Sequence, residues 1–257
     1  MKHGIPMKSL WISSKLKNFN MRVALFVPCY VDQFYPQVAI ASLELLEKLG
    51  IEVHVPSNQT CCGQPMANSG FASSTEGCDT NFFKNFEGFD YIVGPTGSCI
   101  LHLKEHHPSE EIRNSVYEIC EFLVDVLKVK SLSANFPHKI GLHQSCHGQR
   151  GLRLSSMTEL NEAPFSKLAQ LLDLVNGVEY VYPERADECC GFGGTFCVTE
   201  EAVSVRMGQD RVESHLKNEI EYIVGGDTSC LMHMEGILKR QGSKVKVKHI
   251  VEILNHA

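Results

Sequence analysis

The amino-acid sequence predicts an α/β protein made of two pseudo-repeated Rossmann-like lobes, each built on a mostly parallel sheet. Short apolar runs alternate with helical patterns along the chain, which is typical of parallel strands joined by helices. The second half also repeats the first, since FDYIVGPTGSCILHLKE around Cys99 matches IEYIVGGDTSCLMHMEG around Cys230. With 257 residues, 43% of them hydrophobic, the chain is long enough to bury a full core.

Three strands are expected at equivalent places in each half. The candidates are residues 22–28, 51–55, 89–94, 139–143, 178–182 and 220–225. Helical patterns cover residues 35–49, 111–128, 164–175 and 199–218, and further helices are expected after Cys99 and Cys230. In the clearest pattern, 35–49, the apolar residues share one face and Gly50 supplies a left-handed stop. The KVKVK run at 244–248 is expected to form an edge strand with solvated lysines.

The repeat sets the expected domain organisation. We place the first repeat at 21–130 and the second at 131–257, with the linker at about 130–137. Residues 1–20 are interpreted as a leader outside the fold, because Met21 opens directly into a strand-like run and is a candidate for the native start. The leader has neither the apolar core of a secretory signal nor a membrane span, so we expect a cytoplasmic protein. A formal net charge of -6, with both signs mixed along the chain, offers no surface for nucleic acid.

Eleven cysteines require a chemical explanation. In a reducing cytoplasm thiols stay free to act as ligands or redox groups, and the odd total argues against a disulfide scaffold. Inert, buried cysteines are common, but they would not recur in the same order in two halves. The three that have no counterpart, Cys78, Cys120 and Cys197, are interpreted as structural. The eight that recur are Cys29, Cys61, Cys62 and Cys99 in the first half, and Cys146, Cys189, Cys190 and Cys230 in the second.

The positions of these cysteines predict metal sites at the carboxyl ends of strands. Cys29, Cys99, Cys146 and Cys230 each follow a predicted strand, and the carboxyl edge of an open α/β sheet forms the binding crevice. Four thiolates per half suit an iron–sulfur cluster or zinc. Adjacent cysteines direct their side chains differently, which favours a cluster with several irons over one zinc ion. The glycines that follow the pairs permit N–H donation to sulfur.

Histidines lie near both cysteine sets. His102 and His233 follow Cys99 and Cys230 by three residues, and His143 and His147 flank Cys146. They are candidates for additional ligands or for hydrogen bonds to a cluster, and the plain alternative is a histidine with no role at the site. The GFGG stretch at 191–194 lacks the spacing of a dinucleotide fingerprint, so no flavin or nicotinamide site is expected.

The motifs CCGQP at Cys61, CCGFGGTF at Cys189 and SCLMH at Cys230 resemble the duplicated cysteine-rich CCG-domain proteins over residues 21–257. Among these the chain resembles the lactate utilisation protein A (LutA) family, which is related to the glycolate oxidase iron–sulfur subunit and to the cysteine-rich subunit of heterodisulfide reductase. The resemblance implies one 4Fe-4S type cluster per repeat, held by the eight recurring cysteines. In the heterodisulfide reductase relative a fifth cysteine completes each unit, where this chain has His102 or His233.

The resemblance also implies a role in oxidising L-lactate to pyruvate beside two partners, a LutB-like iron–sulfur protein and a LutC-like protein. We therefore expect an electron-transfer subunit of an oxidoreductase that is not catalytic alone. Two alternatives stay open. One is a disulfide or dithiol oxidoreductase of the heterodisulfide reductase type, which activity of the isolated chain on disulfides would favour. The other is a non-redox zinc-binding scaffold, which bound zinc without iron would favour.

Overall fold

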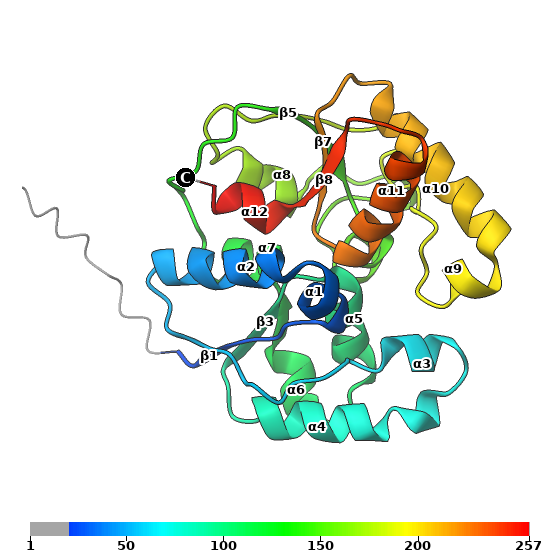
Figure 1. The fold of residues 1–257 in the computed structure, drawn as a ribbon. Helices are drawn as coiled ribbons and strands as arrows, with labels where there is room; N and C mark the ends of the chain where they lie inside the picture. The colour runs from blue at the N-terminus through cyan, green and yellow to red at the C-terminus, as the bar shows by residue number, and fades with distance from the viewer. Residues whose placement is uncertain (1–20, 257) are drawn as a thin grey trace, which may run out of the picture.

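The computed structural model describes residues 21–256, which form two four-stranded parallel sheets covered by helices (Figure 1). The sheets have the same strand order, β2-β1-β3-β4 and β6-β5-β7-β8, so the two-lobed α/β class is confirmed. The expected leader, residues 1–20, lies outside the described residues. The strands are β1 (Val23–Leu25), β2 (Val53–His54), β3 (Tyr91–Gly94), β4 (Val116–Glu118), β5 (Lys139–His143), β6 (Glu179–Val181), β7 (Tyr222–Gly225) and β8 (Lys246–His249).

Helices connect the strands and cover the faces of both sheets (Figure 1). They are α1 (Cys29–Phe34), α2 (Pro36–Lys48), α3 (Gln64–Asn68), α4 (Glu76–Phe86), α5 (Gly97–His106), α6 (Glu110–Ser115), α7 (Ile119–Glu121), α8 (Lys167–Leu172), α9 (Phe196–Thr199), α10 (Glu201–Leu216), α11 (Thr228–Arg240) and α12 (Ile250–Leu254). Two π-helical turns cover Phe122–Val126 and His147–Gly151. Within residues 21–256, no helix combines the length and the apolar character that crossing a membrane requires.

The helix expected at 35–49 is present as α2, and its ends have local causes. Pro36 occupies the first turn, where its missing N–H costs no hydrogen bond. Val38, Leu45 and Leu46 are buried on the face toward the sheet. Gly50 adopts φ +84°, which confirms the left-handed stop. The edge strand expected at 244–248 is also present, as β8 at the end of the second sheet.

The single helix expected over 111–128 is wrong. The structure has α6, then strand β4, then α7 and a π-helical turn. The β-branched and aromatic pair Val116–Tyr117 pairs in parallel with Ile92–Val93 of β3 and completes the first sheet. Glu118 then starts a new helix as its N-cap. A three-residue strand between two helical segments leaves the apolar periodicity almost unchanged, so pattern alone could not reveal it.

The two lobes share a hydrophobic core, and a second cluster of buried residues lies within the second lobe. Buried side chains from both sheets belong to the same cluster, in which β1 is buried along its whole length. Helix α12, at the end of the second lobe, packs beside α2 of the first, as the neighbouring red and blue helices in Figure 1 show. Asn255 accepts a hydrogen bond from Lys48 Nζ at 2.7 Å and donates one to Glu44 at 2.7 Å. The lobes are therefore joined by packing as well as by the chain.

Glu118 is a fully buried carboxyl group at the end of β4. Its Oε2 accepts hydrogen bonds from the backbone N–H of Cys120 at 2.7 Å and of Glu121 at 3.2 Å, whereas Oε1 has no partner within the described residues. Burial raises the pKa of Glu118 to about 8. The folded chain therefore keeps a proton that the unfolded chain loses near its ordinary value of 4.5.

We expect this proton to make stability depend on pH. The free energy of unfolding should fall as pH rises from about 4.5 to about 8, by up to about 1.4 kcal/mol per pH unit. Glu118→Gln keeps an acceptor for the cap and should remove this slope. Urea unfolding at pH 5, 6, 7 and 8 measures it, with the exposed Glu52→Gln as control. An unchanged slope in Glu118→Gln would mean that Glu118 is ionised in the folded state.

Candidate metal centre

The first and last cysteine of each set lie at the carboxyl ends of adjacent strands. Cys29 begins α1 shortly after β1, and Cys99 lies in the first turn of α5, after β3. Cys146 follows β5, and Cys230 lies in the first turn of α11, after β7. Because β1 pairs with β3 and β5 with β7, all in parallel, each pair of strand ends meets at one edge of its sheet.

The adjacent cysteines lie on the loops that follow β2 and β6. In both pairs the first cysteine is half-buried and the second is buried, with Cys62 and Cys190 each 2% exposed. The next residue is a glycine at φ +87° in both lobes. Its N–H donates to the first sulfur of the pair, from Gly63 to Cys61 Sγ and from Gly191 to Cys189 Sγ, at 3.4 Å in both cases. This confirms the N–H donation to sulfur expected from the glycines.

Both cysteine sets face a single cavity. It has a volume of about 70 Å³ and lies between the lobes. The sequence indicates two sets of four but contains no signal that they converge. The lining includes residues of both halves close to the sulfurs, such as Tyr30 and Phe192, whose rings meet edge to face at 5.8 Å. The cysteines that line it are Cys29, Cys61, Cys62, Cys99, Cys146, Cys189, Cys190 and Cys230.

The sulfurs within each set are close enough to share protons. Cys146 Sγ and Cys189 Sγ lie 3.9 Å apart. Hydrogen bonds from the thiols of Cys146 and Cys190 lower the pKa of Cys189 to about 2. The pKa of Cys146 is raised, chiefly because its thiol donates to Cys189 and secondly because it is buried.

The first half has the same arrangement. Hydrogen bonds from Cys29 and Cys62 lower the pKa of Cys61 to about 2, and the pKa of Cys29 is raised by its hydrogen bond to Cys61 and by burial. In each set the first cysteine of the adjacent pair therefore ionises more readily than its hydrogen-bonded neighbours. Binding a soft metal centre would displace the remaining protons.

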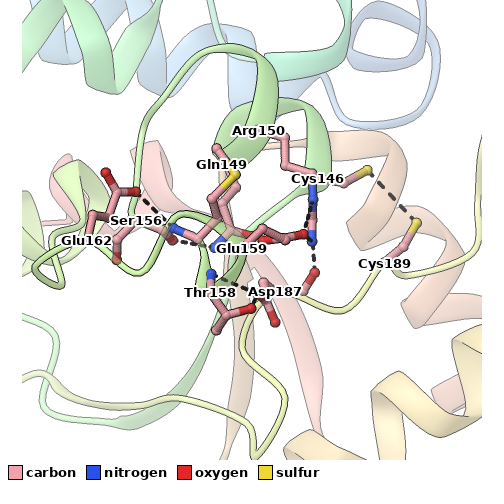
Figure 2. A network of polar contacts seen from close by, with 10 residues as sticks. Cys146, Gln149, Arg150, Ser156, Thr158, Glu159, Glu162, Asp187 and Cys189 are labelled. Carbon is pink, nitrogen blue, oxygen red and sulfur yellow. Dashed lines mark hydrogen bonds and ion pairs between the residues drawn. The ribbon is translucent and has the colours of Figure 1, made fainter.

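A network of hydrogen bonds beside the second set connects the chain segments next to Cys146 and Cys189 (Figure 2). Arg150 donates to the carbonyl oxygen of Asp187 at 3.0 Å, and the N–H of Thr158 donates to Asp187 Oδ2 at 3.2 Å. These contacts connect the turn that follows Cys146 to the loop that leads into Cys189. The extra length between the two cysteines, 42 residues against 31 in the first half, includes this segment. It also borders a cavity of about 700 Å³, which no cysteine within residues 21–256 lines.

The four candidate histidines lie in different surroundings. His147 lines the cysteine cavity, with Nδ1 3.8 Å from Cys146 Sγ. His102 is buried one turn after Cys99, and burial lowers its pKa. His233 Nε2 lies 3.2 Å from the Ser204 carbonyl oxygen, and its ring lines a separate cavity of about 450 Å³ together with Cys197.

The fourth histidine, His143, lies against the second cysteine set. One of its ring nitrogens and the sulfurs of Cys190 and Cys230 lie within 4.8 Å of one another. Its Nε2 is buried and has no hydrogen-bond partner among residues 21–256. Of the cysteines interpreted as structural, Cys120 is fully buried on α7, and Cys78 and Cys197 are half-buried on α4 and α9.

Asp227 was not identified from the sequence. Its carboxylate caps both α5, which carries Cys99, and α11, which carries Cys230. The carboxylate is 1% exposed. Its Oδ1 accepts from the N–H of Ser229 at 3.2 Å in α11, and its Oδ2 accepts from the N–H of Ser98 at 2.8 Å in α5 of the other lobe. Thr96, the equivalent residue of the first half, makes no side-chain cap of its own and forms an antiparallel bridge with Asp227. An aspartate three residues before Cys230 was the available signal.

The donor set fits an iron–sulfur centre. All eight sulfurs belong to soft ligands, and N–H donors already point at two of them. In the second set, the orphaned nitrogen of His143 is a further polar group that a bound centre could satisfy. No carboxylate from the described part of the chain lines the cavity, which disfavours hard cations.

Comparison with known proteins gives consistent matches along the chain. The cysteine-rich domain family CCG matches it twice, at residues 23–104 and 140–235. A "Lactate utilization protein A" from Macrococcus caseolyticus is 41% identical over 248 residues, covering 92% of this chain and 97% of that protein. One from Exiguobacterium sp. is 42% identical over 246 residues, covering 91% and 96%. A hypothetical protein from Helicobacter pylori shares the fold, with a TM-score of 0.58, 13% identity and coverage of 92% of this chain and 49% of that one.

Proposed function

Because the chain belongs to the lactate utilization protein A family of duplicated cysteine-rich CCG-domain proteins, we propose that it is an iron–sulfur electron-transfer subunit in the oxidation of L-lactate to pyruvate. The observation that carries this proposal is the convergence of eight cysteines from two repeats on one cavity. We further propose that the chain works beside a LutB-like iron–sulfur protein and a LutC-like protein in the cytoplasm, and is not catalytic alone.

The chain's own residues would perform three tasks. The eight cysteines would hold the centres, and hydrogen bonds from neighbouring thiols lower the pKa of Cys61 and of Cys189. The N–H groups of Gly63 and Gly191 would stabilise negative charge on sulfur, and the apolar rings around the cavity would restrict water. A bound iron–sulfur cluster supplies one-electron redox chemistry. Oxidation of lactate to pyruvate releases two electrons, so the chain would pass them on singly to a partner.

Iron and acid-labile sulfide per chain are the first measurement that tests the proposal. The protein should be purified anaerobically with its partners and examined by visible absorption and EPR. Several irons with matching sulfide are the expected result. Zinc without iron would favour the scaffold alternative, and turnover of disulfides by the isolated chain would favour the oxidoreductase alternative.

Replacing a paired cysteine should remove iron mainly from one half. We expect Cys61→Ser and Cys189→Ser each to lower iron by about half, because each removes the central thiolate of its own set. Cys120→Ala is the control, since Cys120 is buried away from the cavity and its loss should leave iron unchanged. Complete loss of iron from either single variant would show that the two sets act as one site.

A further inference from the structure

The two lobes differ in the side chains that lie behind their cysteines. In the first lobe, Phe26 stands three residues before Cys29, at the end of the central strand. It packs edge to face against Phe82 and Phe86, which are four residues apart on α4, with ring centroids at 5.1 and 5.9 Å. Phe82 and Phe86 stack at 4.4 Å. This aromatic trio is apolar and carries no charge.

The second lobe has polar residues in the equivalent arrangement. His143 stands three residues before Cys146. It contacts Arg211 and His215, which are again four residues apart, on α10. Arg211 Nε donates to His143 Nδ1 at 3.0 Å, and the rings of His143 and His215 lie 5.9 Å apart, edge to face. A buried His–Arg–His trio therefore replaces three phenylalanines.

The contact with Arg211 fixes the tautomer of His143. A guanidinium group can only donate, so Nδ1 of His143 must accept. A ring that accepts at Nδ1 carries only one N–H proton and is neutral. Its one N–H proton is therefore on Nε2. Among residues 21–256 that group has no hydrogen-bond partner, and one ring nitrogen of His143 and the sulfurs of Cys190 and Cys230 lie within 4.8 Å of one another. His143 thus offers an N–H donor beside the sulfurs of the second set.

Arg211 places a buried positive charge behind the same sulfurs. Its side chain is fully buried, and its terminal nitrogens donate to the carbonyl oxygens of Arg185 and Ala186, the latter at 3.0 Å. Burial lowers the pKa of Arg211 only to about 10, so it stays charged at neutral pH. Within residues 21–256 it forms no ion pair with a carboxylate. The charge of Glu188 and negative charge on the sulfurs of Cys190, Cys230 and Cys189 offset the cost of burying this cation.

We propose that electrons pass within the chain from the first-half cysteine site to the second-half cysteine site. This rests on the proposed iron–sulfur function and assigns a direction to it. Reduction adds one negative charge to a site, which the Arg211 cation and the His143 N–H stabilise in the second half. The phenylalanine trio offers the first half no such stabilisation. An electron that leaves the first-half site, oxidising it, therefore reduces the second-half site, and no proton needs to move. Both sets face one cavity, so this transfer stays within the chain.

The test is a redox titration of the anaerobic, iron-loaded chain with its partners, followed by EPR. Signals are assigned to halves with Cys61→Ser and Cys189→Ser. In the unsubstituted chain the second-half site should have the higher reduction potential. Arg211→Gln removes the charge and should lower the reduced-to-oxidised ratio of the second-half site at least tenfold at fixed applied potential, about 59 mV for a one-electron step. Arg211→Lys keeps the charge and should shift the ratio less.

Two further variants keep the inference testable if Arg211→Gln does not fold. His143→Phe copies the first half and should shift the second-half site in the same direction by a smaller factor. Phe82→Leu changes packing behind the first set without changing charge, and should leave both potentials unchanged. Equal potentials in the unsubstituted chain, or an unshifted second-half site in folded, iron-loaded Arg211→Gln or His143→Phe, would overturn the inference and leave the proposed function intact. A folded chain without iron would overturn both.

Discussion

Asp227→Ala is expected to destabilise the protein by roughly 2–4 kcal/mol and to weaken metal retention in both halves. The first N–H groups of a helix have no partner within the helix, and α5 and α11 begin where water is excluded. The carboxylate of Asp227 caps the N-termini of both helices, because it accepts hydrogen bonds from the backbone N–H groups of Ser98 and Ser229. Its removal leaves donors unsatisfied in two helices at once. It also removes negative charge from the positive ends of both helix dipoles.

The effect should reach the cysteines because Cys99 and Cys230 lie in these same first turns. Chemical unfolding and iron per chain measure the two parts of the prediction. Asp227→Asn keeps one acceptor and should lose less than half as much stability. Ser109→Ala is the matched control, since Ser109 caps only α6 and its loss should cost about 1 kcal/mol without releasing iron. If Asp227→Ala lowered the free energy of unfolding no more than Ser109→Ala, capping two helices with one carboxylate would stabilise the protein no more than an ordinary cap.

Gly191→Ala should be among the most damaging single-methyl changes in the second lobe. Gly191 adopts φ +87°, where a β-carbon costs roughly 1–2 kcal/mol. The added carbon would also lie 2.6 Å from the β-carbon of Met207 and 2.8 Å from the Ser204 carbonyl oxygen, which adds overpacking of about 1–3 kcal/mol. Because the N–H of Gly191 donates to Cys189, movement of this residue should also displace a thiolate.

A matched control separates the two contributions. Gly194 has φ +66° and nothing within 4 Å of the position its β-carbon would take. Gly194→Ala should therefore show the backbone cost alone in its free energy of unfolding, about 1–2 kcal/mol. Thermal or chemical unfolding of the two variants, with iron per chain, gives the comparison. Similar losses in both would show that the neighbours of Gly191 relax at little cost.

The sequence was sufficient for the sheets and for the approximate position of the cysteine sets, because both follow from local pattern and from repetition. Apolar runs located the strands, and the carboxyl ends of parallel strands lie at one edge whatever the details of packing. Strand β4 was not predicted, because three strand residues between helical segments hardly disturb a helical periodicity.

The parts that pattern could not predict depend on contacts between distant segments. The single cavity depends on how two lobes pack, which no local spacing encodes. Arg211 was within a predicted helix, but periodicity indicates only a helix face and not which side chains it meets. Its partner His143 is 68 residues away in the sequence. Asp227 accepts a hydrogen bond from the N–H of Ser98 in the other lobe, 129 residues away in the sequence. Only the three-dimensional structure reveals this contact.

The bridge between Thr96 and Asp227 bears on how the two repeats came to share one chain. Two identical copies related by a twofold axis would present the same side chain at both positions. Two aspartates there would bury like charges side by side, and two threonines would leave both helix starts without a carboxylate. Fusion of duplicated genes frees the two positions to differ, so that one acid can serve both helices. The covalent link thus gives access to an asymmetric arrangement that a symmetric homodimer of single repeats cannot adopt.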